Sequence, residues 1–141
     1  MAALRILVTG GRGYDDADRV ETALRSVLET LLGPEHATSQ AVLVHGDAPG
    51  LDRLAGAVAA RLGLAVEAHP ADWAGPCRPT CPPHRRRRHD GSDYCPAAGV
   101  YRNAAMVELG ADVAVAFPGG RGTSDCVRRI KAAGITLVEV A

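Results

Sequence analysis

Short apolar segments recur along the chain, each close to a glycine or proline. They occupy residues 4–8, 41–44, 64–68, 113–117 and 136–140. Short, continuous apolar runs bounded by turn residues are typical of strands buried on both faces of a parallel sheet. The pattern therefore predicts about five strands, with residues 4–8 in the middle of the sheet.

The longer segments between these strands have apolar residues at helical spacing. They predict helices at residues 20–31, 51–62, 100–109 and 124–133, the first preceded by capping candidates at 15–18. Strands that alternate with helices through short connections form parallel sheets with helices on both faces. We therefore expect an α/β fold, a doubly wound parallel sheet, in a single domain that spans residues 1–141.

Glycine-rich turns follow three of the predicted strands. They are Gly10-Gly11-Arg12-Gly13, Gly46-Asp47-Ala48-Pro49-Gly50 and Gly119-Gly120-Arg121-Gly122-Thr123. In doubly wound sheets, ligands bind beyond the carboxyl ends of the strands, and a glycine turn before a helix suits a phosphate. Any one such turn could be an ordinary connection, but three at strand ends favour a binding site for an anionic ligand.

The composition fits one domain with a full core, because the chain has 141 residues of which 47% are hydrophobic. The formal net charge is zero, which argues against a general attraction to nucleic acid or membranes. No segment approaches the roughly 20 apolar residues of a membrane span, and the N-terminus leads directly into a strand. We therefore expect a cytoplasmic protein that does not interact with membranes, whose cysteines do not form structural disulfides.

Between residues 69 and 98 the periodic pattern gives way to prolines, cysteines and arginines, which indicates an inserted or elaborated loop. Three thiols and one imidazole there form a complete tetrahedral set for a structural Zn²⁺, with the ligands Cys77, Cys81, His84 and Cys95. The alternative fourth ligand is His89, and the alternatives to a metal are free thiols or a disulfide. The fourth cysteine, Cys126, lies on the apolar face of a predicted helix and is interpreted as a core residue.

Four consecutive arginines, Arg85 to Arg88, lie within the same loop. They would offset the negative charge of a thiolate-bound zinc ion. Clustered guanidinium groups also bind nucleic-acid phosphates, but the run lacks interleaved aromatic residues. A solvated loop is therefore favoured, and contact with nucleic acid through these arginines remains the alternative.

Five segments together carry a resemblance to a known family: VTGGR (8–12), HGDAPGLDRLA (45–55), HPADW (69–73), RNAAM (102–106) and PGGRGT (118–123). They resemble the YspA-related branch of the SLOG superfamily, which also contains the lonely-guy phosphoribohydrolases and the Smf-type DNA-processing proteins. The resemblance implies a Rossmann-like fold that binds a nucleotide or nucleotide derivative, and relatives are often homodimers. The cysteine-rich insertion is similar to a variant within this branch.

The resemblance assigns nucleotide contacts to residues of the matching motifs. They are Gly10, Gly11, Arg12, Gly46, Asp47, Gly50, Asp52, Arg102, Asn103, Gly119, Gly120, Arg121, Gly122 and Thr123. From position alone, a role as caps of turns and helices is favoured for Asp47 and Asp52 over ligand contact.

The hydrolase relatives imply a second function, cleavage of the base from a nucleoside monophosphate. In this chain Asn103 replaces the lysine of their motif, and Cys126 stands where they have the catalytic glutamate. A phosphoribohydrolase-like N-glycosidase would therefore use Arg102 with the neighbouring carboxylate, Asp125. A third hypothesis is an interaction module that contacts protein or nucleic acid through the zinc loop.

Overall fold

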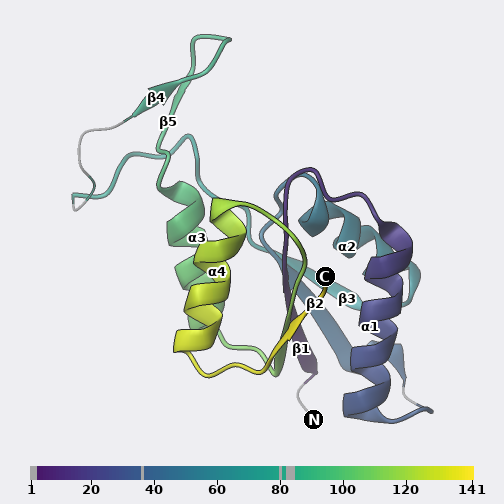
Figure 1. The fold of residues 1–141 in the computed structure, drawn as a ribbon. Helices are drawn as coiled ribbons and strands as arrows, with labels where there is room; N and C mark the ends of the chain where they lie inside the picture. The colour runs from purple at the N-terminus through teal and green to yellow at the C-terminus, as the bar shows by residue number, and fades with distance from the viewer. Residues whose placement is uncertain (1–2, 36, 80, 82–84) are drawn as a thin grey trace.

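A five-stranded parallel sheet forms the centre of the computed structural model, which describes residues 3–35, 37–79, 81 and 85–141 (Figure 1). Its strands are β1 (Leu4–Thr9), β2 (Ala41–His45), β3 (Ala65–Ala68), β6 (Val113–Ala116) and β7 (Leu137–Glu139). Their spatial order is β3-β2-β1-β6-β7, all parallel, so the strand order reverses next to β1. The predicted α/β, Rossmann-like fold, with residues 4–8 in mid-sheet, is confirmed.

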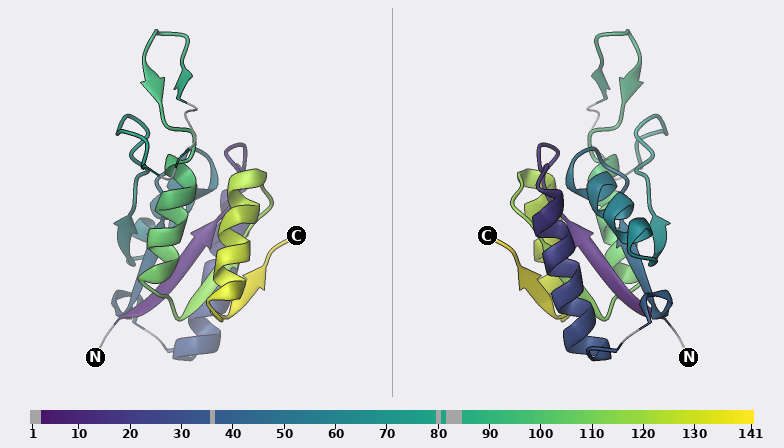
Figure 2. Two further views of the ribbon diagram at one scale, coloured as in Figure 1. Left: turned by 90° about the vertical axis from the view of Figure 1, so that its left-hand side faces the viewer. Right: turned by 90° about the vertical axis from the view of Figure 1, so that its right-hand side faces the viewer.

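Helices cover both faces of this sheet, as predicted. Helices α1 (Ala17–Leu32) and α2 (Leu51–Arg61) pack on one face, and α3 (Ala98–Glu108) and α4 (Arg121–Ala132) pack on the other (Figure 2). A short 3₁₀ helix, Thr38–Gln40, precedes β2. In the described part of the chain, no helix has both the length and the apolar character that a membrane span needs.

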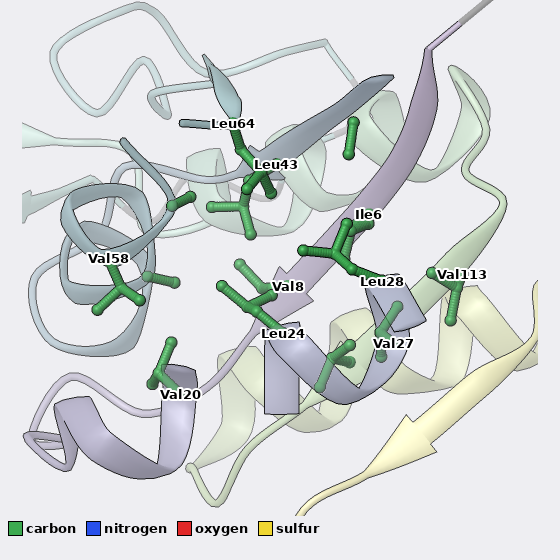
Figure 3. Close-up of a cluster of buried hydrophobic side chains, with 14 of the residues drawn as sticks. Ile6, Val8, Val20, Leu24, Val27, Leu28, Leu43, Val58, Leu64 and Val113 are labelled. Atoms are coloured by element: carbon green, nitrogen blue, oxygen red, sulfur yellow. The ribbon is translucent and has the colours of Figure 1, made fainter. Parts of the chain in front are cut away.

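The central strand supplies both cores because its side chains alternate between the two faces. Ile6 and Val8 pack against Leu24 and Leu28 of α1, all at most 1% exposed (Figure 3). Leu7 enters the second core, between the sheet and the pair formed by α3 and α4. Full burial of each such side chain contributes about 1.5–3 kcal/mol, so the alternation of β1 holds the three layers together.

The first helix shows how local sequence sets an element's bounds. The carboxylate of Asp16, at the N-cap of α1, accepts a hydrogen bond from the Arg19 N–H at 3.1 Å. At the other end Gly33 adopts φ +87° and terminates the helix. Asp16 lies within the predicted capping segment 15–18, and the helix begins three residues before and ends one residue after its predicted bounds.

A small hairpin within residues 69–98 was not predicted. Its strands, β4 (Arg86–Arg87) and β5 (Asp93–Tyr94), pair antiparallel and project beyond α3 (Figures 1 and 2). Gly91 closes the turn at φ +89°, and the Arg88 N–H donates to the Ser92 carbonyl at 2.7 Å. The Asp90-Gly91 dipeptide is a common hairpin signal and was the clue in the sequence.

Candidate functional site

The three glycine turns meet at one edge of the sheet. The Gly11 N–H donates to the Pro118 carbonyl at 2.9 Å, and the Leu51 N–H donates to the Gly11 carbonyl at 3.0 Å. The first turn is therefore hydrogen-bonded to both of the others. They follow β1, β2 and β6, so they lie where the strand order reverses, which is the usual ligand position in doubly wound sheets.

Close approach between the turns explains several of their glycines. A Cβ on Gly11 would lie 3.0 Å from the Gly119 Cα. A Cβ on Gly50 would lie 2.3 Å from the Arg12 carbonyl oxygen, and Gly50 has φ +83°, which side chains rarely adopt. These glycines let the turns pack on one another, a tertiary requirement that does not depend on a ligand.

The packed turns enclose a cavity of about 470 Å³, which we call the glycine cavity. Its lining includes Gly10, Gly11, Gly120, Gly122 and Thr123. Unlike the glycines that join the turns, Gly120 and Gly122 have open space where a Cβ would project. Bare backbone therefore faces the cavity at the third turn.

The start of α4 contributes to this cavity. The helix begins at Arg121, three residues before its predicted start, with Gly120 as N-cap and no side-chain cap. Residues 121–123 line the cavity. The first N–H groups of a helix have no partner within it and carry its positive end, so this wall favours an anion.

Arg102 and Asn103 connect the second turn to the third. The Arg102 guanidinium donates to the Gly46 carbonyl and, at 2.8 Å, to the Asn103 side-chain oxygen. The Asn103 amide then donates to the Gly122 carbonyl at 3.2 Å and to Asp125 at 3.0 Å. Both side chains also line the glycine cavity, so they connect two of its turns and are in a position to contact a ligand there.

Asp52 holds the second turn by hydrogen bonds and also lies in the wall of the glycine cavity. One carboxylate oxygen accepts hydrogen bonds from the Gly46 N–H at 3.1 Å and the Ala48 N–H at 3.3 Å. The residue is 7% exposed and also lines the glycine cavity. Burial raises the pKa of Asp52, although these backbone bonds and the nearby charge of Arg102 oppose the rise.

His45, the last residue of β2, stabilises the start of the second turn. Its Nδ1 accepts a hydrogen bond from the Asp47 N–H at 2.8 Å, where Asp47 adopts φ +54°. Burial lowers the pKa of His45, which favours the neutral ring at pH 7, and because Nδ1 accepts this hydrogen bond the proton of the neutral ring is on Nε2. That nitrogen lies 2.9 Å from where a Cβ on Gly56 would be, so Gly56 leaves room for the ring.

The catalytic candidate Asp125 lies outside the lining of the glycine cavity. Its carboxylate accepts from Arg128 at 2.6 Å and from Arg129 at 3.0 Å, as well as from Asn103. Burial raises the pKa of Asp125, but these hydrogen bonds outweigh burial and hold it below the usual value. Asp125 is therefore ionised at neutral pH and engaged with other side chains.

Cys126 is a core residue, as expected, and is 1% exposed. Burial raises the pKa of its thiol to about 11. The side chain is a neutral thiol at pH 7, so it supplies neither the carboxylate that the hydrolase relatives have here nor a thiolate.

Of the fourteen nucleotide contacts suggested by the resemblance, ten line the glycine cavity: Gly10, Gly11, Arg12, Asp52, Arg102, Asn103, Gly120, Arg121, Gly122 and Thr123. Gly46 and Asp47 line an adjoining pocket, and Gly50 and Gly119 lie where the turns pack together. Sequence reasoning missed wall residues that have no distinctive chemistry: Ala48, Pro96 and Gly99.

Three of the four proposed metal ligands come together. The sulfur atoms of Cys77, Cys81 and Cys95 all lie within 4.8 Å of one another. His84 lies outside the described residues. His89 is described, lies exposed in the hairpin turn, and is not part of this group.

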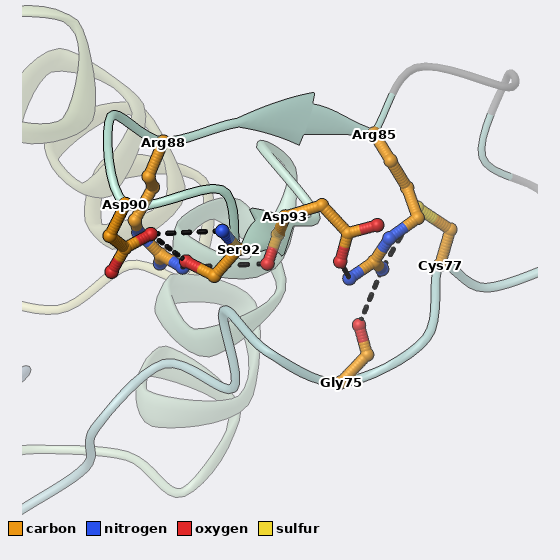
Figure 4. Close-up of polar contacts among 7 residues, drawn as sticks. All are labelled: Gly75, Cys77, Arg85, Arg88, Asp90, Ser92 and Asp93. Atoms are coloured by element: carbon orange, nitrogen blue, oxygen red, sulfur yellow. Dashed lines mark hydrogen bonds and ion pairs between the residues drawn. The ribbon is translucent and has the colours of Figure 1, made fainter.

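Arg85 joins the cysteine group to the hairpin. Its guanidinium donates to the Gly75 carbonyl at 2.7 Å and pairs with Asp93 at 2.8 Å, and it lies 3.9 Å from the Cys77 sulfur (Figure 4). A thiolate at Cys77 would therefore have a positive partner.

Comparisons with known proteins agree with this architecture. The family described as YspA, cpYpsA-related SLOG matches residues 4–75, just over half of the chain. The Gene 61 protein of Mycobacterium phage D29 is 34% identical over 141 residues, an alignment that covers 95% of this chain and 94% of that protein.

Among solved structures, the X-ray structure of DNA processing protein A (DprA) from Streptococcus pneumoniae is similar, with a TM-score of 0.50 and 18% identity. The match covers 96% of this chain but 58% of DprA. At this identity the similarity concerns the fold alone.

Proposed function

Because this chain belongs to the YspA, cpYpsA-related SLOG family, we propose that it binds a nucleotide or nucleotide derivative with a phosphate in the glycine cavity. The observation that carries the proposal is the joining of three strand-end turns around one cavity of about 470 Å³. That volume lies in the range of about 300–1,000 Å³ typical of small-molecule sites.

The charges around the cavity support an anionic ligand. Its lining contains three guanidinium groups, from Arg12, Arg102 and Arg121, and among the described lining residues Asp52 has the one carboxylate. In the proposed mode, the phosphate contacts the backbone N–H groups at the start of α4 and an arginine. The turn that follows β2 then contacts the sugar or base, with Asp52 near a ribose hydroxyl.

We expect binding without cleavage. A panel of the four common ribonucleoside 5′-monophosphates, titrated by calorimetry, should give at least one dissociation constant in the micromolar range. Chromatography of the same mixtures should detect no free base, because Asp125 lies outside the cavity lining and Cys126 carries no charge. Base release that is lost in Asp125→Asn would establish the N-glycosidase alternative. No binding of any of these monophosphates, or of the corresponding triphosphates, would contradict the proposal.

For the cysteine group we propose one structural Zn²⁺ bound by Cys77, Cys81 and Cys95, with His84 as the fourth ligand. Tetrahedral zinc with bonds of about 2.3 Å to sulfur separates its ligand sulfurs by about 3.8 Å, which is compatible with a group contained within 4.8 Å. The ion would offset the ordering entropy of the loop that carries the hairpin.

Elemental analysis of the purified protein should find about one zinc per chain, and Cys95→Ser should lose it. Cys126→Ala is the matched control, since it removes the cysteine that lies in the core and should leave the zinc content unchanged. Metal-free wild-type protein, or equal zinc in Cys95→Ser, would exclude the site. A cytoplasmic location, a homodimer and nucleic-acid contact through the arginine run stay predictions from the sequence.

A further inference from the structure

A second pocket, of about 760 Å³, adjoins the glycine cavity. We call it the arginine pocket because five arginines line it: Arg12, Arg53, Arg86, Arg88 and Arg102. Arg12, Trp73 and Arg102 line both spaces, so the two share a wall. One ligand can therefore be in contact with both.

The hairpin divides the four consecutive arginines between two environments. Arg86 pairs with Tyr94 across the strands, and both line the arginine pocket, as does Arg88. Arg87 instead lies opposite Asp93 in the strand register, and the Asp93 carboxylate accepts a hydrogen bond from Arg85. Because alternate residues of a strand face opposite sides, Arg86 and Arg88 face the pocket, and Arg85 and Arg87 do not line it.

Positive charge exceeds negative charge in this pocket, although Asp52 lies near Arg102 and Asp90 lies near Arg88. Its described lining has a single carboxylate, Asp47, which pairs with Arg53 at 3.4 Å. The guanidinium of Arg12 lies 5.8 Å from the Trp73 ring centre, and that of Arg88 lies 4.6 Å from the Tyr94 ring centre. Contact with a ring orients a guanidinium. One nitrogen of Arg88 donates to the Ser92 hydroxyl and the Asp93 carbonyl, both at 3.4 Å, which leaves its other N–H groups to face a phosphate.

We propose that the arginine pocket is a second anion subsite, which takes further phosphate groups of the ligand held in the glycine cavity. The inference rests on the proposed function and narrows it. The preferred ligand is then a nucleotide with two or more phosphates, not a monophosphate. Phosphates in a polyphosphate chain and a phosphate between two nucleosides present the same chemistry to these arginines.

The alternative for Arg86 and Arg88 is a solvated surface, which would need no particular arrangement. Against it, the hairpin directs them into the same pocket as arginines from three other parts of the chain, Arg12, Arg53 and Arg102. Like charges that outnumber their acidic neighbours repel one another, and a bound polyanion removes that cost.

The test compares nucleoside 5′-mono- and triphosphates of the four common bases by calorimetry at about 0.15 M salt. For the base that binds best, we expect the wild type to bind the triphosphate at least tenfold more tightly than the monophosphate. The double variant Arg86→Ala/Arg88→Ala should lose about tenfold or more in triphosphate affinity while its monophosphate affinity is unchanged.

The matched control is Arg87→Ala/Arg25→Ala, which removes the same charge outside the pocket and should keep the triphosphate preference. Equal losses in both double variants, or equal wild-type affinities for the two ligands, would overturn the subsite while monophosphate binding still supports the proposed function. No binding of any nucleotide would overturn both. A 5′-phosphorylated dinucleotide of the same base then distinguishes a phosphodiester ligand from a polyphosphate.

Discussion

Replacing Gly50 with alanine is expected to destabilise the protein by about 3 kcal/mol or more and to abolish nucleotide binding. Gly50 has φ +83°, and its Cβ would lie 2.3 Å from the Arg12 carbonyl oxygen and 2.4 Å from that of Gly11. These are backbone atoms, so no side chain can rotate away. The first two turns would have to separate, breaking the bond from the Leu51 N–H to Gly11 that joins them.

The control for this change is Gly13→Ala in the first turn. A Cβ at Gly13 meets no atom within 4 Å, so its stability should stay within about 0.5 kcal/mol of the wild type. Denaturant unfolding of the three proteins gives both differences. If Gly50→Ala were as stable as Gly13→Ala, the result would contradict the close packing of the first two turns at Gly50.

The second large effect is expected for Arg102→Ala, which should destabilise the protein by about 3 kcal/mol at pH 7. The change removes the donor to the Gly46 carbonyl and the positive charge beside Asp52. Asp52 is 7% exposed, so its carboxylate would be left buried with less compensation. Arg102 also lines both ligand spaces, so nucleotide affinity should fall as well.

This destabilisation should depend on pH in a defined direction. Burial already raises the pKa of Asp52 from its ordinary value of 3.8, and loss of Arg102 should raise it further. A raised pKa makes a carboxyl group costly to the fold at neutral pH and harmless below the unfolded value, where both states are protonated. The stability difference between variant and wild type should therefore shrink as the pH falls toward about 4.

A double-mutant cycle isolates the charge. Asp52→Asn keeps an oxygen that can accept from the Gly46 and Ala48 N–H groups but carries no charge, so it should restore part of the stability lost in Arg102→Ala. Strict additivity of the two changes, together with a pH-independent loss, would show that Arg102 acts through its hydrogen bonds and packing and not through its charge.

Local patterns were sufficient to predict the fold. The run that became β1 is short and apolar apart from Arg5 and Thr9, and Asp16 and Gly33 mark the ends of α1 as capping rules require. Alternation of such elements leaves few topologies, because crossover connections are right-handed. The position of the three turns at strand ends followed from the same pattern.

The contacts inside the site could not be predicted in this way. Gly11 and Gly119 are 108 positions apart, and only the folded sheet shows that their backbones touch. Likewise, position alone favoured a capping role for Asp52, and only the structure shows that its hydrogen bonds within the turn go together with a place in the cavity wall.

The hairpin was missed for a different reason. Its strands have two residues each, too short for any periodic pattern, and the arginines hide the alternation of faces. The division of the run became evident only from the pairing of Arg86 with Tyr94 and of Arg87 with Asp93.

The central claim is that the three turns together bind a phosphate-bearing ligand in the glycine cavity. Amide chemical shifts in a nucleotide titration test this claim most directly. With the monophosphate that binds best, the amides of Gly11, Ala48 and Gly122, one from each turn, should shift together with a single dissociation constant. Shifts confined to one turn, or to residues outside all three, would contradict the claim.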